Sequence, residues 1–210
     1  FLILTAILVG SYAGYFISGK VQMTEMPQLV AALHSFVGLA AVFIGLNAEM
    51  MLNSIITLRD SGLQMNSSEL TGFGEKLWQK DSLELGILKA EVFLGIFIGA
   101  ITFTGSIVAF GKLAGKLDGA PKKLKGGHYL NAMSLFVCLI LGWMYLDGAG
   151  IWSMIIVTII SGFIGWHLIM GIGGADMPVV VSLLNSLSGI AAAFTGFIFS
   201  NSVLIVAGSL

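Results

Sequence analysis

Long apolar runs constrain this chain more than any other feature of its sequence. Runs of roughly 20 residues with few charges recur along its length, and about 20 apolar residues are needed for a helix to cross a hydrocarbon core about 30 Å thick. Hydrophobic residues make up 57% of the chain and charged residues 10%, whereas soluble chains carry about 25% charged residues. The sequence therefore predicts an all-α, polytopic transmembrane helix bundle and excludes a soluble domain.

We expect about six complete spans and a truncated seventh. The predicted spans are 1–19, 28–49, 88–111, 129–146, 151–172 and 179–199, and a further one begins near residue 202. The chain opens inside an apolar run without a charged signal segment and closes with Val203–Leu210, which is too short to span. We therefore expect residues 1–210 to be one transmembrane domain, a fragment of a longer chain. The single cysteine, Cys138, excludes an intrachain disulfide.

The connections between these spans alternate between two faces, and lysines mark one of them. Residues 20–27, 112–128 and 173–178 lie on the lysine-rich face, and residues 50–87, 147–150 and 200–201 lie on the other. Positive-inside bias places the lysine-rich face in the cytoplasm. No basic stripe with interleaved aromatic residues is present, so nothing indicates nucleic-acid binding.

Within the longest connection, residues 63–80 fit two interpretations equally well. Leu70, Phe73, Leu77 and Trp78 would form an apolar stripe if the segment is helical. Such a helix would lie in the membrane interface. A solvated loop is the alternative.

A 21-residue segment occurs twice. Residues 25–45 and 176–196 share ten identities, and the first residue of each copy is acidic, Glu25 or Asp176. The identical pairs are Met26/Met177, Pro27/Pro178, Val30/Val181, Leu33/Leu184, Ser35/Ser186, Gly38/Gly189, Ala40/Ala191, Ala41/Ala192, Phe43/Phe194 and Gly45/Gly196. Both spans enter from the cytoplasmic face, so the copies form a parallel repeat, as in transporters whose site lies between two copies. The prolines suit a first helical turn.

Seven residues after each proline the copies carry His34 and Asn185, roughly 10 Å deeper in the membrane. Each lies on a stripe of small residues that lets helices approach closely, so we expect both side chains to face other helices and to bond each other. An ionisable group within a membrane is by default a functional candidate, and histidine titrates near neutrality. One interpretation is a proton relay; the other is a hydrogen bond that only holds two helices together.

Other titratable residues carry weaker signals. Glu91 lies one turn inside the outer face on a stripe with Gly95, Thr102 and Ser106, and it fits either a proton entry path or an interfacial acid near Lys89. We expect Glu49 to be interfacial and solvated. We expect His167 and His128 to be interfacial rather than members of a relay.

The segment Gly171–Asp176, G-I-G-G-A-D, superficially suggests a nucleotide-binding loop. That fingerprint needs a preceding strand within a βαβ unit, and here a membrane span precedes it. We expect a tight cytoplasmic turn that presents Asp176. Asp176 then either caps the next helix or has a docking or coupling role.

The two repeat copies, the span that contains Glu91 and the end of the chain together resemble the membrane domain of the proton-translocating nicotinamide nucleotide transhydrogenases, specifically its beta-subunit part. The matching segments cover just over a third of the chain in family order, whereas residues 50–88 and the fourth span match poorly. They are 23–42 (M-T-E-M-P-Q-L-V-A-A-L-H-S-F-V-G-L-A-A-V), 91–113 (E-V-F-L-G-I-F-I-G-A-I-T-F-T-G-S-I-V-A-F-G-K-L), 165–168 (G-W-H-L), 172–189 (I-G-G-A-D-M-P-V-V-V-S-L-L-N-S-L-S-G) and 201–210 (N-S-V-L-I-V-A-G-S-L).

The resemblance implies part of an enzyme, a translocase and oxidoreductase that couples inward proton movement to hydride transfer from NADH to NADP+. NAD(H) and NADP(H) would bind soluble domains absent from this chain, which itself would bind no cofactor or metal. It implies a proton path through His34 and Asn185, with Glu91 considered part of it, and a loop at Asp176 that faces the NADP(H) domain. The implied partners are the proton, the lipid bilayer, both nucleotide-binding domains and a second copy in a dimer. The implied location is a bacterial inner membrane, or the mitochondrial inner membrane in a eukaryote.

Two other functions fit the residues taken alone. A stand-alone secondary transporter or channel would use His34 for ion or substrate coupling, and a structural anchor would need only its hydrogen-bonded core. A dinucleotide-binding domain after the last helix would favour the transhydrogenase, and a natural stop would favour these alternatives.

Overall fold

The computed structural model describes residues 1–62, 72–122, 124 and 126–210, and every regular element within them is helical. The α-helices are α1 (Leu2–Ser18), α2 (Met26–Asp60), α3 (Phe73–Gln79), α4 (Ser82–Leu113), α5 (Gly127–Met144), α6 (Ile151–Met170), α7 (Met177–Phe199) and α8 (Ser202–Ser209). Single turns of 3-10 helix, η1 (Met23–Glu25) and η4 (Gly174–Asp176), precede α2 and α7, and a π-helical turn, η3 (Tyr145–Ala149), follows α5.

The predicted all-helical membrane bundle is confirmed. Among the described residues, five helical segments are long and apolar enough to cross a membrane: those containing α2, α4, α5, α6 and α7. Helix α1 is apolar but only 17 residues long, and α8 has eight residues.

The predicted loop over 50–87 was wrong at both ends. Helix α2 continues to Asp60, and α4 already begins at Ser82. A reciprocal capping box starts α4: the Glu84 amide donates to Asp81 Oδ1 at 2.7 Å, and the Asp81 amide donates to Glu84 Oε2 at 3.0 Å. Residues 73–79 form α3, which favours the helical interpretation there, whereas 63–71, with Leu70, lie outside the described residues.

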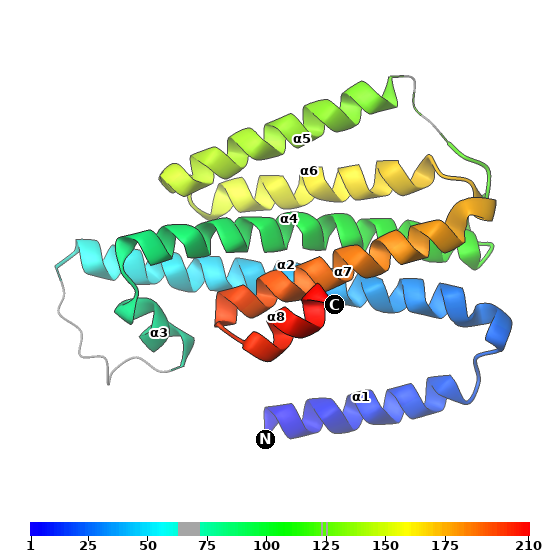
Figure 1. Cartoon of the computed structure of the whole chain (residues 1–210), viewed down its shortest axis with the longest axis horizontal. Helices are drawn as coiled ribbons and strands as arrows, with labels where there is room; N and C mark the ends of the chain where they lie inside the picture. Colours follow the sequence, from blue (N-terminus) through cyan, green and yellow to red (C-terminus); the bar gives the residue numbers. More distant parts are fainter. Residues whose placement is uncertain (63–71, 123, 125) are drawn as a thin grey trace.

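Helix α4 occupies the centre of the bundle and packs against α2, α6 and α7 (Figure 1). Helix α5 lies on the outer side of α6, α8 packs on α7, and α1 lies apart with no buried residue. The α1–α2, α4–α5 and α6–α7 connections meet at one end of the bundle, on the right in Figure 1. The turns after α5 and α7 lie toward the other end, with α3. The connections therefore alternate between two ends, as the loop assignment predicts.

Glycines set the closest helix contacts. A Cβ atom at Gly38 of α2 would lie 2.6 Å from the carbonyl oxygen of Gly99 on α4. A Cβ atom at Gly189 of α7 would lie 2.8 Å from the carbonyl oxygen of Gly208 on α8. Between α4 and α6, the Thr104 hydroxyl donates to the Gly162 carbonyl at 2.7 Å. Small residues and interhelical hydrogen bonds of this kind drive helix association in lipid.

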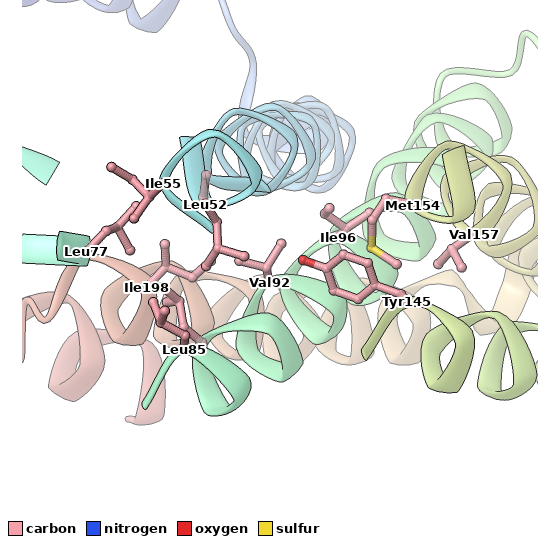
Figure 2. Close-up of a cluster of buried hydrophobic side chains, with 12 residues drawn as sticks. Leu52, Ile55, Leu77, Leu85, Val92, Ile96, Tyr145, Met154, Val157 and Ile198 are labelled. Carbon is pink, nitrogen blue, oxygen red and sulfur yellow. The ribbon is translucent and has the colours of Figure 1, made fainter. Parts of the chain in front are cut away.

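An apolar cluster fills the half of the bundle that adjoins α3. It joins α2, α3, α4, α6 and α7, with the Tyr145 ring beside Ile96 and Met154 (Figure 2). A second cluster lies nearer the lysine-rich end and includes Ala31, Val108 and Leu184. His34 and the residues around it, described below, lie between the second cluster and the middle of the bundle.

The two copies of the repeat begin alike. Each starts as a 3-10 turn that leads into a helix with proline in its first turn, and α2 and α7 run in the same direction (Figure 1). Their small-residue stripes pack differently, because the α2 stripe lies on α4 and the α7 stripe lies on α8. Equivalent residues of the two copies therefore share a depth but not a neighbour.

Candidate functional site

His34 lies where α2 meets α7. It is eight residues into α2, and its ring is half-buried. Its Nδ1 atom lies 2.9 Å from the hydroxyl oxygen of Ser188 on α7. Its Nε2 atom is buried and has no hydrogen-bond partner among the described residues.

Ser188 has one hydrogen and two acceptors within reach. Its hydroxyl oxygen lies 2.9 Å from His34 Nδ1 and 2.9 Å from the Leu184 carbonyl oxygen. When the hydroxyl donates to Leu184, it accepts from a protonated Nδ1, and Nε2 of the neutral ring is a free base. When Nδ1 loses its proton, the hydroxyl can donate to it instead. The pair thus accommodates either neutral tautomer by rotating one hydroxyl group, and the imidazolium needs the same hydroxyl direction as the neutral ring with Nδ1–H.

The predicted bond between His34 and Asn185 was wrong. Ser188 occupies Nδ1, Nε2 has no partner among the described residues, and the Asn185 side chain is exposed. Asn185 lies one turn before Gly189 on the face of α7 that packs on α8, whereas His34 meets the neighbouring face. The alignment of the two repeat copies predicts how far along α7 Asn185 lies, but not which side of α7 carries it.

Ser106 of α4 is a second hydroxyl at the same depth. It is fully buried, and its Oγ atom has no partner within the described ranges. Gly38 of α2 abuts the backbone of Phe103 on antiparallel α4. His34, one turn before Gly38, therefore lies level with Ser106, about one turn beyond Phe103. The sequence pattern placed Ser106 on the Glu91 stripe but did not associate it with His34.

Glu91 is not near His34. It lies 15 residues before Ser106 on α4, which is about 22 Å along the helix axis. The Glu91 side chain is half-buried and lines a cavity of about 410 Å3 with Ser200 and Ser202 at the end of α7. Its position is thus at the end of the bundle opposite Asp176, as the spans predict, and no described side chain links it directly to the histidine.

One expectation about exposure was wrong. Glu49 is 2% exposed rather than solvated, and it accepts a hydrogen bond from the Tyr145 hydroxyl. His167 lies three residues before the end of α6 and is 7% exposed. Its Nδ1 atom lies 2.7 Å from Asn131 Oδ1 on α5, whereas His128 is exposed. The sequence shows the depth of such groups, but the helices that cover them come from distant parts of the chain.

Asp176 is exposed at the start of α7, as expected for a tight turn, and its side chain makes no capping bond. The turn is fastened to the neighbouring loop by backbone bonds. The Gly174 amide donates to the Gly119 carbonyl at 2.8 Å, and the Lys122 amide donates to the Met170 carbonyl at 3.0 Å. The two connections at the lysine-rich end therefore form one unit around Asp176.

A buried lysine strengthens this unit. Lys112, the penultimate residue of α4, is 6% exposed. Its Nζ atom donates to the carbonyl oxygens of Ile169, Met170 and Ile172 at 3.3, 2.9 and 2.6 Å. The first two carbonyls end α6 and the third lies in the turn after it, where a cation also complements the helix dipole. Lys112 thereby ties the helix of Ser106 to the turn that carries Asp176.

No cluster of three or more His, Cys, Asp or Glu side chains in the described part of the chain is placed to hold a metal ion. The site offers a half-buried imidazole whose Nδ1 meets the Ser188 hydroxyl and whose buried Nε2 has no partner among the described residues. Such a group can bind and release a proton.

A family model for the NAD(P) transhydrogenase beta subunit matches residues 1–210. The beta subunit of NAD(P) transhydrogenase from Rhodospirillum rubrum is 40% identical over 208 residues, which is 99% of this chain and 40% of that protein. A second sequence of the subunit, from a named strain of the same organism, gives the same identity and coverage. The chain thus spans well under half the length of the relatives it matches. It belongs to the NAD(P) transhydrogenase beta subunit family.

Proposed function

We propose that this chain is the part of a transhydrogenase that carries protons across the membrane, and that His34 is the group that binds them. The observation that carries the proposal is the His34 Nε2 atom, buried and without a partner among the described residues, on a ring whose other nitrogen meets Ser188. A basic nitrogen with no partner is poorly stabilised in a membrane interior unless it exchanges a proton or meets water.

The proton steps need only this chain's own groups and water. A proton arriving at Nε2 converts the ring to imidazolium, while Nδ1–H donates to Ser188 and Ser188 donates to the Leu184 carbonyl. On release the ring is neutral again. Ser106, level with the ring and with a free hydroxyl group, is placed to hold water beside it.

Coupling to hydride transfer would run through the cytoplasmic unit that contains Asp176. Helix α4 joins the depth of His34 to that unit, because Lys112 bonds the end of α6. A shift of α4 against α2 or α7 on protonation would therefore move the turn that carries Asp176. We propose that this turn meets an NADP(H)-binding domain, that an NAD(H)-binding domain completes the enzyme, and that the assembly is a dimer in a bacterial or mitochondrial inner membrane.

Glu91 and Asn185 have secondary roles in this proposal. Glu91 lines a cavity at the opposite end of the bundle and would receive protons from the outer side. Asn185 would contribute a polar group to the same path at the depth of His34, on the α8 side of α7. Membership of the transhydrogenase beta subunit family favours this function over a stand-alone transporter or channel.

The deciding experiment replaces His34 in the complete enzyme in sealed vesicles. We expect His34→Ala to reduce proton pumping to the level of empty vesicles and to reduce coupled turnover strongly. His128→Ala is the matched control, because that histidine is exposed. Pumping by His34→Ala at the rate of the wild-type enzyme would remove His34 from the mechanism.

A further inference from the structure

A carboxyl group and a phenol are buried together at the end of the bundle opposite the lysine-rich loops. Glu49 of α2 is 2% exposed and Tyr145 of η3 is 1% exposed, and the Tyr145 hydroxyl donates to Glu49 Oε2. Helix α2 has 35 residues and is about 52 Å long, longer than a hydrocarbon core about 30 Å thick. Glu49, 23 residues after Met26, lies about 35 Å along it and so near the outer edge of that core.

The charge of Glu49 is only partly balanced. No lysine or arginine in the described ranges lies within 4.0 Å of its carboxylate. The nearest candidate, Lys89 of α4, shares the cavity with Glu49 and places its Nζ atom 5.9 Å from the centre of the Tyr145 ring. A buried carboxylate with one hydrogen bond and a more distant cation can exist in the ionised or the neutral form, so it can bind and release a proton.

A polar cavity reaches this carboxyl group. Its volume is about 260 Å3, and its walls include Asn53, Thr57, Asp60 and Lys89 besides Glu49 and Tyr145. Asp60 ends α2 at the outer end of the bundle and is exposed. Because one water takes about 30 Å3 and the walls offer several polar partners, water can connect Glu49 with that side.

The opposite side of the cluster is closed. Ile96, Val92 and Met154 are fully buried around the Tyr145 ring, and Ile96 fills the space beside Gly45, one turn before Glu49 (Figure 2). His34 lies 15 residues away, about 22 Å along α2. Glu49 therefore faces the outer compartment only.

We propose that Glu49 is a proton-binding site on the outer side of the pump, held by Tyr145 and exchanging protons with that compartment through the cavity. The proposal rests on the proposed proton translocation and adds a second site to it. On binding, a hydronium ion of the outer compartment gives its proton to the carboxylate and becomes water, and release is the reverse. Binding converts the Tyr145–Glu49 contact from a charge-assisted to a neutral hydrogen bond, about half as strong.

This change acts on the junction of α5 and α6. Tyr145 lies in a π-helical turn, and Gly148 within that turn has φ 109°. Turns of this kind frequently occur at functional sites. The titratable and charged groups that face Glu49 across the cavity are Tyr145, Lys89 and Asp60.

The test uses the complete enzyme in vesicles whose cytoplasmic face points outward. Nucleotides and a fixed pH are in the bath, and trapped buffers set the lumen pH from about 5.5 to about 8.5. The initial rate of NADP+ reduction by NADH is measured at each lumen pH. We expect Glu49→Gln to abolish the lumen-pH midpoint of the wild-type enzyme or move it by more than about one pH unit.

Two further variants complete the test. Asp147→Asn removes an exposed acid from the same turn and should leave the midpoint unchanged. Tyr145→Phe keeps the carboxyl group and removes its donor, so the midpoint should shift but persist. If Glu49→Gln does not assemble, Tyr145→Phe decides. The inference is overturned if Glu49→Gln has the lumen-pH profile of the wild-type enzyme. If only Tyr145→Phe assembles, a wild-type profile in that variant overturns it. A midpoint shift in Asp147→Asn as large as that in Glu49→Gln also overturns it.

Failure of this inference is separable from failure of the proposed function. If the wild-type enzyme pumps and His34→Ala does not, while Glu49→Gln keeps the wild-type profile, only the outer site is excluded. If His34→Ala pumps normally, the proposed function itself fails.

Discussion

At the scale of single residues, a serine determines what His34 can do. Ser188 meets Nδ1 and leaves Nε2 as the buried nitrogen without a partner among the described residues. Hydrogen bonds made by the second nitrogen of an imidazole decide which nitrogen carries the proton. Ser188 therefore acts as a positioning residue for the proposed proton-binding atom.

Removing that hydroxyl is the residue-level prediction. In Ser188→Ala, Nδ1 loses its partner at a cost of about 1–3 kcal/mol. Coupled turnover should fall about 5- to 160-fold, and its pH profile should shift because the imidazolium loses the hydrogen bond from Nδ1–H to the hydroxyl. Ser186→Ala is the control, since within the described part of the chain the Ser186 hydroxyl bonds only the Ser182 carbonyl of its own helix, at 3.3 Å. A wild-type pH profile in Ser188→Ala, with turnover unchanged, would contradict the role of the serine.

The sequence predicted the position of His34 along its helix better than it predicted the partner of the ring. The proton chemistry inferred from the unperturbed pKa of histidine stays a prediction. The partner could not be predicted, because the alignment of two helices gives no rotation of one about the other. Ser188, three residues from Asn185, is offset by about 60° around α7, which is enough to exchange one neighbour for the other.

At the scale of helices, the contact between α2 and α4 positions His34. Gly38 of α2 faces the backbone of Gly99 and Phe103, so any side chain there meets atoms that cannot rotate away. The helix ends were harder to predict than the spans. Residues 50–60 are polar enough to resemble a loop, yet they remain helical because Ile55 and Leu52 pack in the apolar cluster beside α3 and α4.

Widening that contact should destabilise the bundle. In Gly38→Ala the new Cβ atom would lie 2.6 Å from the Gly99 carbonyl oxygen, so the helices must separate at a cost of about 1–3 kcal/mol. We expect a lower unfolding temperature in detergent and reduced pumping. Gly86→Ala in α4, where no atom lies within 4 Å of the new Cβ, should be neutral or stabilising by up to about 1 kcal/mol. Equal stability of the two variants would refute the close contact.

Lys112 offers a prediction about the end of α6. Lys112→Met keeps the length of the side chain and leaves three carbonyl oxygens without their donor. The α6–α7 turn should then open more often. The Gly174 amide, which donates to the Gly119 carbonyl in the wild-type protein, should exchange its hydrogen about tenfold faster for each 1.4 kcal/mol by which the closed turn is destabilised. Lys116→Met should leave this rate unchanged, because Lys116 is exposed and its Nζ lies over the Phe110 ring. Unchanged exchange in Lys112→Met would exclude a role for the lysine in holding the turn.

At the scale of the whole molecule, the two ends of the bundle differ in chemistry. One end carries the lysines and the fastened loops around Asp176, and the other carries Glu91, the cavity of Glu49 and the turn at Gly148. The proposed pump would need such a difference, because its proton-binding group would meet the two compartments in turn and the proposed nucleotide-binding domains would contact one end only. Positive-inside bias assigns the lysine-rich end to the cytoplasm.

That assignment can be tested with single cysteines. Asp118→Cys lies in the α4–α5 connection and Asp147→Cys lies in the α5–α6 turn, and both positions are exposed at opposite ends of the bundle. The native Cys138 is buried and should give little background with a membrane-impermeant maleimide. Asp118→Cys should be labelled in vesicles whose cytoplasmic face points outward, and Asp147→Cys in vesicles of the opposite orientation. Labelling of both cysteines from one side would place both connections in a single compartment, so α5 would not cross the membrane. The cavity beside Glu49 would then not open to the outer compartment, as the further inference requires.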